Sequence, residues 1–474
     1  MFIFNYYFAN KKAAYALKWY GQVDIAKLSI KNREELNFKM GYCYLVTKNL
    51  KLAKNKFIQL INSPLYGNDS RYYFGYIAYK MEDYGLAEST LKEIEDNDTY
   101  RLEISYYLLD INFKAGKFER SIRIGKELIK SVKRNQKSEI SKIIGESFFN
   151  LKQYAESIPY LKDYKGKKGK WNNTDFYQLG YAYYKQNDFE NAISNFNKII
   201  DQKNSVSQNA YYHLGECYMK LGKKSEALNA FKSASEMYFN QKTKEDAALN
   251  YAKLSYETGN PFKSVAEVLQ DYLNTYPKSK AYDEIKDLVI ASYLHQRDYE
   301  GALVFLNKKN ARKNLPIIQE VSLYRGIQLL NDNKIKEAIP FFAKSLQSEN
   351  NEVKTRATYW EAESYYLLQN YTTALGKFMT LNNKKNSIQD LFLLDYNIGY
   401  SNFKLKDYKN AIAAFDIFIQ NDTIDISFKN DAMVRLGDCH FALRDYNKAI
   451  SSYKTVVDNI GADADYAEYQ IAIS

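Results

Sequence analysis

The sequence of 474 residues is poor in cysteine, histidine and proline, with three, three and six of these residues. Three cysteines are too few for a disulfide framework. Six prolines leave long stretches without a residue that breaks helices. The residues after Met1 form too short an apolar stretch for a signal peptide or a membrane span. These shortages exclude a small disulfide-linked fold and favour a helical chain.

Aromatic residues, in contrast, make up 16% of the chain, and many of them recur in a fixed frame. The frame is a glycine, a small residue twelve positions later and an aromatic residue four positions after that. One copy is Gly180, Ala192 and Phe196, and the next is Gly215, Ala227 and Phe231. The second copy is the first moved on by 35 residues. A period of this length indicates an array of one small supersecondary unit.

Each unit is predicted to consist of two helices separated by a short turn. Apolar residues recur every three to four positions in residues 175–185 and again in residues 189–200, which is the spacing of one helix face. Between them, Gln186-Asn187-Asp188 is a polar break suited to a turn. Gly180 and Ala192 are small where the two helices must approach closely. Neither helix can bury its apolar face alone, so the units must stack on one another.

This frame resembles the tetratricopeptide repeat, whose pattern places a large apolar residue, Leu-Gly, Tyr, Ala, Phe and Ala at set positions. The resemblance covers essentially the whole chain, with repeats 34 to 38 residues apart. It implies an all-α fold, a right-handed superhelical solenoid of about thirteen helix-turn-helix repeats. The small residue of each second helix serves as the marker of its repeat: Ala16, Ala53, Ala87, Ser121, Ser157, Ala192, Ala227, Ser264, Ala302, Ala338, Ala374, Ala411 and Ala449.

Three repeats depart from the frame at the glycine. Leu109, Ala252 and Ile290 stand where the fourth, eighth and ninth repeats should have this residue. We expect looser or differently angled helix packing there.

The two ends of the chain do not resemble the polar caps that a solenoid needs. The chain opens on the apolar stretch from Phe2 to Phe8, already inside a first helix, and closes on residues 466–474, a fourteenth first helix without a partner. We therefore expect residues 1–474 to be one continuous solenoid and a segment of a longer array, with incomplete first and last repeats.

Residue types that build catalytic centres are too scattered to converge. His213, His295 and His440 are about two repeats or more apart, and a solenoid brings only neighbouring repeats together. No glycine-rich phosphate loop follows a strand. The three cysteines stand two residues after a frame glycine or its equivalent, where a small core residue is expected. We predict no catalytic residue, no metal site and no cofactor.

One basic run, residues 165–171, combines four lysines with Trp171. It has the residue types of a phosphate-binding patch with an aromatic ring for stacking on a base. The alternative is a solvated turn between repeats, and the ordinary spacing of 35 residues from Ser157 to Ala192 favours it. The net charge of +11 is mild for 474 residues and is not by itself a sign of nucleic-acid binding.

In tetratricopeptide proteins the first helices line the inner, concave surface, where ligands usually lie. The resemblance places the inward positions three before, one after and four after the glycine. A stripe of tyrosines occupies them, with a basic margin at Lys80, Lys114, Lys185, Lys220 and Lys404 and with acids nearby. We predict that partners bind at Tyr72, Tyr76, Tyr79, Tyr106, Tyr177, Tyr181, Tyr184, Tyr212, Tyr359, Tyr366, Tyr396 and Tyr400.

Tyrosine suits recognition because it offers a large rigid contact area and a hydroxyl for orientation. The alternative is that many of these rings pack against the adjacent repeat and are only half exposed. Tyr177 and Tyr181 occupy the places where a clamp for a C-terminal carboxylate would need lysine and asparagine. A receptor of that kind is therefore not expected.

We interpret the chain as a scaffold or adaptor that binds protein or peptide segments. Its richness in Lys, Asn, Tyr and Phe and its long degenerate array also resemble large envelope-associated repeat proteins of Bacteroidota-type bacteria. That resemblance implies a periplasmic or outer-membrane-associated location and a role in cell-envelope assembly or secretion. A cytosolic adaptor and an RNA-binding helical-repeat protein are the alternatives.

Overall fold

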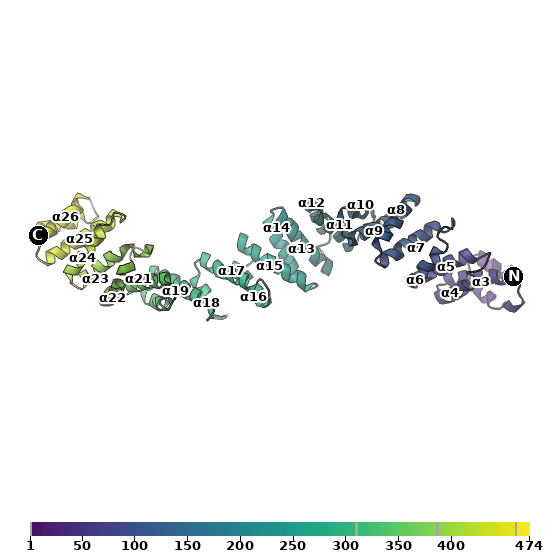
Figure 1. Cartoon of the computed structure of the whole chain (residues 1–474), viewed down its shortest axis with the longest axis horizontal. Helices are drawn as coiled ribbons and strands as arrows, with labels where there is room; N and C mark the ends of the chain where they lie inside the picture. The colour runs from purple at the N-terminus through teal and green to yellow at the C-terminus, as the bar shows by residue number, and fades with distance from the viewer. Residues whose placement is uncertain (1, 309–310, 385–387, 460–461) are drawn as a thin grey trace. The chain divides into compact units, whose positions relative to one another are not determined.

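The computed structural model describes residues 2–308, 311–384, 388–459 and 462–474, and every regular element in these ranges is a helix (Figure 1). Three are short 3-10 helices, η1 (Ile25–Lys27), η2 (Asn382–Lys384) and η3 (Gln389–Leu393). The chain divides into two compact units, Met1–Pro261 and Phe262–Ser474. The prediction of an all-α fold is confirmed.

The first unit alternates first and second helices, as expected for helix-turn-helix repeats. Its first helices are α1 (Phe2–Ala9), α3 (Ile30–Val46), α5 (Gly67–Lys80), α7 (Arg101–Lys114), α9 (Arg134–Asn150), α11 (Asn173–Lys185), α13 (Ser205–Lys220) and α15 (Gln241–Thr258). Its second helices are α2 (Ala13–Tyr20), α4 (Leu50–Ile58), α6 (Tyr84–Lys92), α8 (Phe118–Ser131), α10 (Tyr154–Asp163), α12 (Phe189–Phe196) and α14 (Lys224–Glu236).

The second unit begins with a second helix and continues the same alternation. Its second helices are α16 (Val265–Thr275), α18 (Tyr299–Lys308), α20 (Ile335–Ser345), α22 (Tyr371–Met379), α24 (Tyr408–Ile419) and α26 (Tyr446–Asp458). Its first helices are α17 (Tyr282–His295), α19 (Leu315–Asn331), α21 (Asn351–Leu367), α23 (Leu394–Lys404), α25 (Ile426–Ala442) and α27 (Ala464–Ile473).

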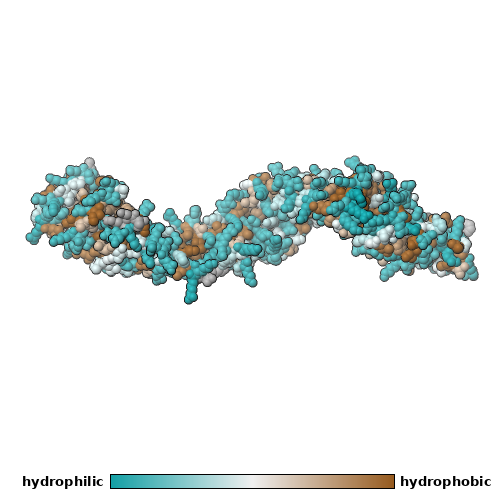
Figure 2. All heavy atoms as spheres, viewed as in Figure 1, coloured by the Kyte–Doolittle hydropathy of each residue, from teal (hydrophilic) through white to brown (hydrophobic). Residues whose placement is uncertain are grey.

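Within each unit the first helices of successive repeats contact one another as well as their own second helices. These contacts join α5, α7, α9, α11, α13 and α15 in the first unit, and α19, α21, α23 and α25 in the second. We call the side of each unit formed by these helices its first-helix face. On the face of the molecule in view, hydrophobic residues lie among hydrophilic ones rather than in one broad band (Figure 2).

Twelve of the thirteen predicted markers are confirmed, because each is the fourth residue of a second helix and is fully buried. Two of them are serines rather than alanines, and their hydroxyls need a partner in the core. Ser121 donates a hydrogen bond of 3.2 Å to the carbonyl of Leu109, and Ser157 donates one of 2.9 Å to the carbonyl of Gly145. A serine is tolerated at the marker because the facing first helix supplies an acceptor.

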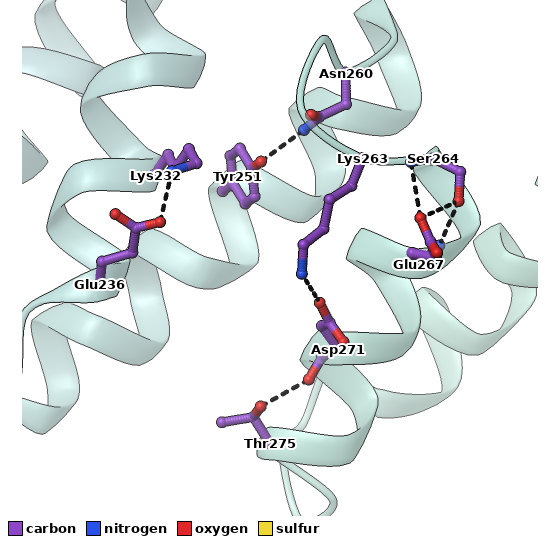
Figure 3. A network of polar contacts seen from close by, with 9 residues as sticks. All are labelled: Lys232, Glu236, Tyr251, Asn260, Lys263, Ser264, Glu267, Asp271 and Thr275. Atoms are coloured by element: carbon purple, nitrogen blue, oxygen red, sulfur yellow. Dashed lines mark hydrogen bonds and ion pairs between the residues drawn. The ribbon is translucent and has the colours of Figure 1, made fainter.

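The eighth marker, Ser264, is wrong. Ser264 is the N-cap of α16: its hydroxyl accepts from the backbone N–H of Glu267, whose carboxylate accepts from the backbone N–H of Ser264 (Figure 3). The buried fourth residue of α16 is Val268. The spacings are therefore 41 (227 to 268) and 34 (268 to 302) residues, so the turn before α16 holds four residues more than expected.

This longer turn is held by local side-chain contacts on each side. Gly259 ends α15 with a φ of 80°. Asn260 donates to the hydroxyl of Tyr251, 2.8 Å away, within the first unit. Lys263 forms an ion pair of 2.7 Å with Asp271 within the second unit (Figure 3). The four additional residues could not be recognised from the sequence, because Ser264 is a small residue at the spacing expected for the marker.

The frame glycine is small because the aromatic residue of the same repeat lies against it. A Cβ on Gly180 would come 2.9 Å from the ring of Phe196, and one on Gly399 would come 2.7 Å from the ring of Phe415. Contacts this short force one of the helices to move. The predicted close approach of the two helices is confirmed.

The fourth repeat exchanges the sizes of these two positions. Leu109 takes the place of the glycine and is fully buried, and Gly125 takes the place of the aromatic residue. In the ninth repeat Ile290 stands in place of the glycine and Leu306 in place of the aromatic residue, and both are buried. Ala362 also stands in place of a glycine, in the eleventh repeat. This departure was not among those named from the sequence.

In every repeat except the eighth, the inner turn contains one residue in the left-handed region, five positions before the marker. Its φ lies between 56° and 72° in twelve repeats. Glycine has this conformation at Gly116 and Gly222, but the other positions carry bulkier residues such as Lys152 and Asn187. After this residue an Asp or Asn often caps the second helix, as Asp188 does by accepting from the backbone N–H of Asn191.

The three cysteines are buried in helix contacts, as predicted for small core residues. All three thiols are free. Burial raises the pKa of Cys43 to about 11 and the pKa values of Cys217 and Cys439 to about 12. These thiols therefore remain protonated at neutral pH, which matches a packing role.

Candidate interaction surface of the first helices

Eleven of the twelve tyrosines predicted to bind a partner are half-buried on the first helices, and Tyr359 is buried with 3% exposed. Tyr359 packs against Phe378 of its own repeat. The lysines of the basic margin are all exposed: Lys80, Lys114, Lys185, Lys220 and Lys404.

In the third and fourth repeats the tyrosines are fixed by their neighbours. The ring of Tyr72 stacks on that of Tyr100 with centroids 4.0 Å apart. Tyr79 donates a hydrogen bond of 2.6 Å to Asp110 of the next repeat, which also pairs with Lys114 at 2.8 Å. Burial, and then this acceptor, raise the pKa of Tyr79. Here the rings join adjacent repeats and remain partly exposed.

In the sixth and seventh repeats the aromatic side chains surround a histidine. The centroid of the His213 ring is 5.1 Å from that of Tyr181 and 5.1 Å from that of Tyr184. His213 Nδ1 is 2.7 Å from a carboxylate oxygen of Glu216, and Lys185 lies 5.1 Å above the Tyr181 ring. Two further rings, those of Tyr177 and Tyr212, are within about 6 Å of the imidazole. We call this group the His213 cluster.

Sequence reasoning missed one position of the first-helix face, two residues before the frame glycine or its equivalent. It is half-buried in eleven repeats, and five of these carry an aromatic or imidazole ring there. The signal was available in the sequence, since these rings recur in the same register as the tyrosine stripe. The eleven residues are Lys39, Tyr73, Tyr107, Gln178, His213, Asn250, Leu288, Tyr324, Trp360, Asn397 and Arg435.

The second unit has a pocket of about 620 Å³ between α21, η3 and α23. Aromatic side chains from these helices and from α25 form much of its wall, namely Trp360, Phe392, Tyr396 and Phe428. Its polar lining includes Arg356, Glu363, Gln389, Asp390 and Asn397. Of the twelve predicted tyrosines, Tyr359 and Tyr396 line it.

Beyond this pocket, α23 and α25 share a network around one carboxylate. Tyr396 and Tyr400 both donate to the same oxygen of Asp431, at 2.7 and 2.5 Å. Arg435 donates to the hydroxyl of Tyr400 at 3.0 Å. Burial, followed by the hydrogen bond to Asp431, raises the pKa of Tyr400 to about 12. These rings are held in fixed orientations on the first-helix face.

The basic run of residues 165–170 forms a tight turn. Gly166 and Gly169 both have positive φ, and Lys167 and Lys170 form an isolated bridge. The indole N–H of Trp171 donates to the carbonyl of Tyr164 at 2.8 Å, so its ring is tied to the protein. Within the described part of the chain, no group of three His, Cys, Asp or Glu residues has an arrangement that could hold a metal ion.

Two family models match parts of the chain. The model for anaphase-promoting complex, cyclosome, subunit 3 matches residues 167–234 and 331–418, and the model described as tetratricopeptide repeat matches residues 396–466. Both follow the frame that the helices confirm. The chain contains tetratricopeptide repeats. The matched tetratricopeptide stretches contain the His213 cluster and most of the residues that line the pocket.

No curated protein matches the sequence. A solved structure titled "Structure of Naa15/Naa10 bound to HypK-THB" aligns with 99% of this chain and 76% of its own, at 11% identity and a TM-score of 0.35. Among the described residues, no helix of this chain is long and apolar enough to cross a membrane.

Proposed function

We propose that this tetratricopeptide scaffold binds extended segments of other proteins along its first-helix faces. The observation that supports this proposal is the row of half-buried aromatic side chains whose orientations are fixed by neighbouring repeats. The His213 cluster is the clearest case, because Tyr181 and Tyr184 pack around one imidazole. Rings that are already ordered lose little conformational entropy when a partner binds.

The experiment compares two double variants of the full chain. Tyr181→Ala with Tyr184→Ala removes two rings from the first-helix face. Tyr238→Ala with Phe239→Ala is the matched control, because these residues lie in the turn after α14 and are 72% and 53% exposed. Peptides selected from a random displayed library on the wild-type chain are then titrated against all three proteins.

We expect the first variant to lose at least tenfold in affinity for the selected peptides, because interface energy concentrates in a few aromatic anchors. The control should bind as the wild type does, and circular dichroism should show equal helical content. Equal affinity of all three proteins would contradict binding at this face.

For the cellular role, we propose cell-envelope assembly or secretion. The support is the composition, with 45 tyrosines and 26 phenylalanines among 474 residues and abundant Lys and Asn, together with the long repeat array. Fractionation of the native cells tests this proposal. Recovery of the protein with the envelope or periplasm is expected, and recovery only with the cytosol would contradict it.

A further inference from the structure

The pocket of the second unit contains two carboxylates that differ in how they are neutralised. Asp390 forms an ion pair of 2.9 Å with the Nε of Arg356. The same oxygen of Asp390 accepts the indole N–H of Trp360 at 2.8 Å. The positive charge of Arg356 therefore offsets that of Asp390, and this pair gives the pocket no net charge.

Among the side chains that the structure describes, Glu363 is not paired with a cationic side chain in the way that Asp390 is paired with Arg356. Its carboxylate accepts a hydrogen bond of 2.9 Å from the side-chain amide of Asn397, which also lies 3.1 Å from the hydroxyl of Tyr359. Within the described residues, no lysine or arginine forms an ion pair with Glu363. Burial raises the pKa of this carboxyl to about 7. A buried carboxylate without a cation is unfavourable, and a bound cation would stabilise its charged form.

The walls of the pocket suit the same kind of ligand. Trp360, Tyr396 and Phe428 present aromatic rings, and the face of such a ring attracts a cation. Its volume of about 620 Å³ holds a long side chain together with the backbone on either side. The one uncompensated charge on this wall is negative.

We propose that this pocket binds the side chain of an arginine or lysine from a partner segment, with Glu363 as the counter-ion. This inference rests on the proposed function, since it specifies which residue of a bound segment enters the second unit. The proposed ligand is positively charged, whereas a clamp for a C-terminal carboxylate binds a negatively charged group. Asn397 holds the carboxylate in place.

The test uses Trp360 as the reporter. The full chain has three tryptophans, so Trp19→Phe with Trp171→Phe leaves Trp360 as the only one. The probes are acetylated and amidated pentapeptides Ala-Leu-X-Leu-Ala, in which X is arginine, lysine, norleucine or glutamate. Norleucine keeps the length of the lysine side chain but has no charge.

We expect the arginine and lysine peptides to bind at least tenfold more tightly than the norleucine peptide at pH 8. Glu363→Gln should reduce this preference to less than threefold without changing the affinity for the norleucine peptide. Glu363→Asp keeps the charge and should retain part of the preference. Glu352→Gln, which changes an exposed acid on the same helix, should retain all of it.

Three results would overturn the assignment: equal binding of the lysine and norleucine peptides, an unchanged preference in Glu363→Gln, or no fluorescence change with any peptide. The outcome is separable from the proposed function, because the double variant at Tyr181 and Tyr184 tests the other unit. If that variant loses its peptides while the charge preference is absent, the scaffold proposal stands and the pocket assignment fails.

Discussion

Gly125 on α8 lies opposite Leu109 on α7, at a distance where the Cβ that Gly125 lacks would come 3.2 Å from Leu109 Cδ1. The same Cβ would come 2.6 Å from Ile144 Cγ1 on α9. Leu109 thus occupies the volume that an aromatic residue fills in other repeats. The repeat keeps its packing because the large and small residues have exchanged helices.

We predict that Gly125→Ala destabilises the first unit by about 1–3 kcal/mol, although alanine is the better helix former. The reason is the contact with Ile144, which lies in a packed core and has little room to move. Chemical denaturation followed by circular dichroism measures the change. Ile144→Ala in the same chain should recover part of the loss relative to the sum of the two single variants.

Gly376→Ala is the matched control. Gly376 also lies inside a second helix, α22, but a Cβ there would meet nothing within 4 Å. This change should stabilise the second unit by up to about 1 kcal/mol through helix propensity alone. If both substitutions shift stability in the same direction, the packing explanation for Gly125 is wrong.

Much of the fold could be predicted from the sequence, because each repeat carries its own helix periodicity and a small residue at a fixed place. Ser264 shows where this reasoning fails: spacing alone cannot separate a buried marker from an N-cap when both are small. Leu109 was expected to loosen the packing of its repeat, because the prediction took account of the glycine position alone. It left out the facing aromatic position, which is occupied by Gly125. Packing in a repeat can be predicted only when the residue at the glycine position and the residue at the facing aromatic position are considered together.

The interaction surface was only partly predictable. The tyrosine stripe is placed on the first helices as expected, but the resemblance supplied three positions for each helix and left out the fourth. That position holds His213, which is the centre of the His213 cluster, and Trp360, which lines the pocket of the second unit. The pocket itself depends on η3, whose residues do not follow the repeat frame. No periodic pattern predicts a segment of this kind.

The turn inside each repeat offers a second test. Lys152 has a φ of 61°, a conformation that costs a residue with a Cβ about 1–2 kcal/mol. Lys152→Gly removes this strain but makes the unfolded chain more flexible, so we expect a net stabilisation of roughly 0.5–1 kcal/mol. The midpoint of urea unfolding measures it.

Gly222→Ala is the reverse change at the same register, with a φ of 72° and open space around the added Cβ. It should destabilise the chain by about 1 kcal/mol through backbone strain alone. Asn187→Gly should have a smaller effect than Lys152→Gly, since asparagine tolerates this region. Stabilisation by Gly222→Ala would show that the left-handed turn is not required.

The basic run should not bind nucleic acid specifically, because the ring of Trp171 packs against those of Tyr164 and Phe176 and its N–H is bonded to the carbonyl of Tyr164. We predict that replacing Lys165, Lys167, Lys168 and Lys170 with serine leaves the affinity for selected peptides unchanged. Binding of single-stranded RNA is measured at several salt concentrations. A steep salt dependence that the substitution abolishes would establish a nucleic-acid site here.

The Glu363 carboxyl should make the stability of the second unit depend on pH. Its folded pKa is raised from 4.5 to about 7, so below pH 4.5 the group is protonated in both states and has no effect. As the pH rises from 4.5 to 7, the unfolded chain ionises first and the folded state loses stability. The loss is complete above pH 7 and is on the order of 1–3 kcal/mol.

Glu363→Gln replaces the carboxyl with a neutral group of the same shape, so the variant should be as stable as the wild type at pH 4.5 and more stable at pH 8. Hydrogen exchange of α21 and α23, measured at both pH values, reports on this unit without assuming that the whole chain unfolds in one step. Glu352→Gln controls for the general effect of removing an acid from α21. Parallel pH profiles for the wild type and Glu363→Gln would mean that the carboxyl is already ionised in the folded chain, and that its burial does not set its charge.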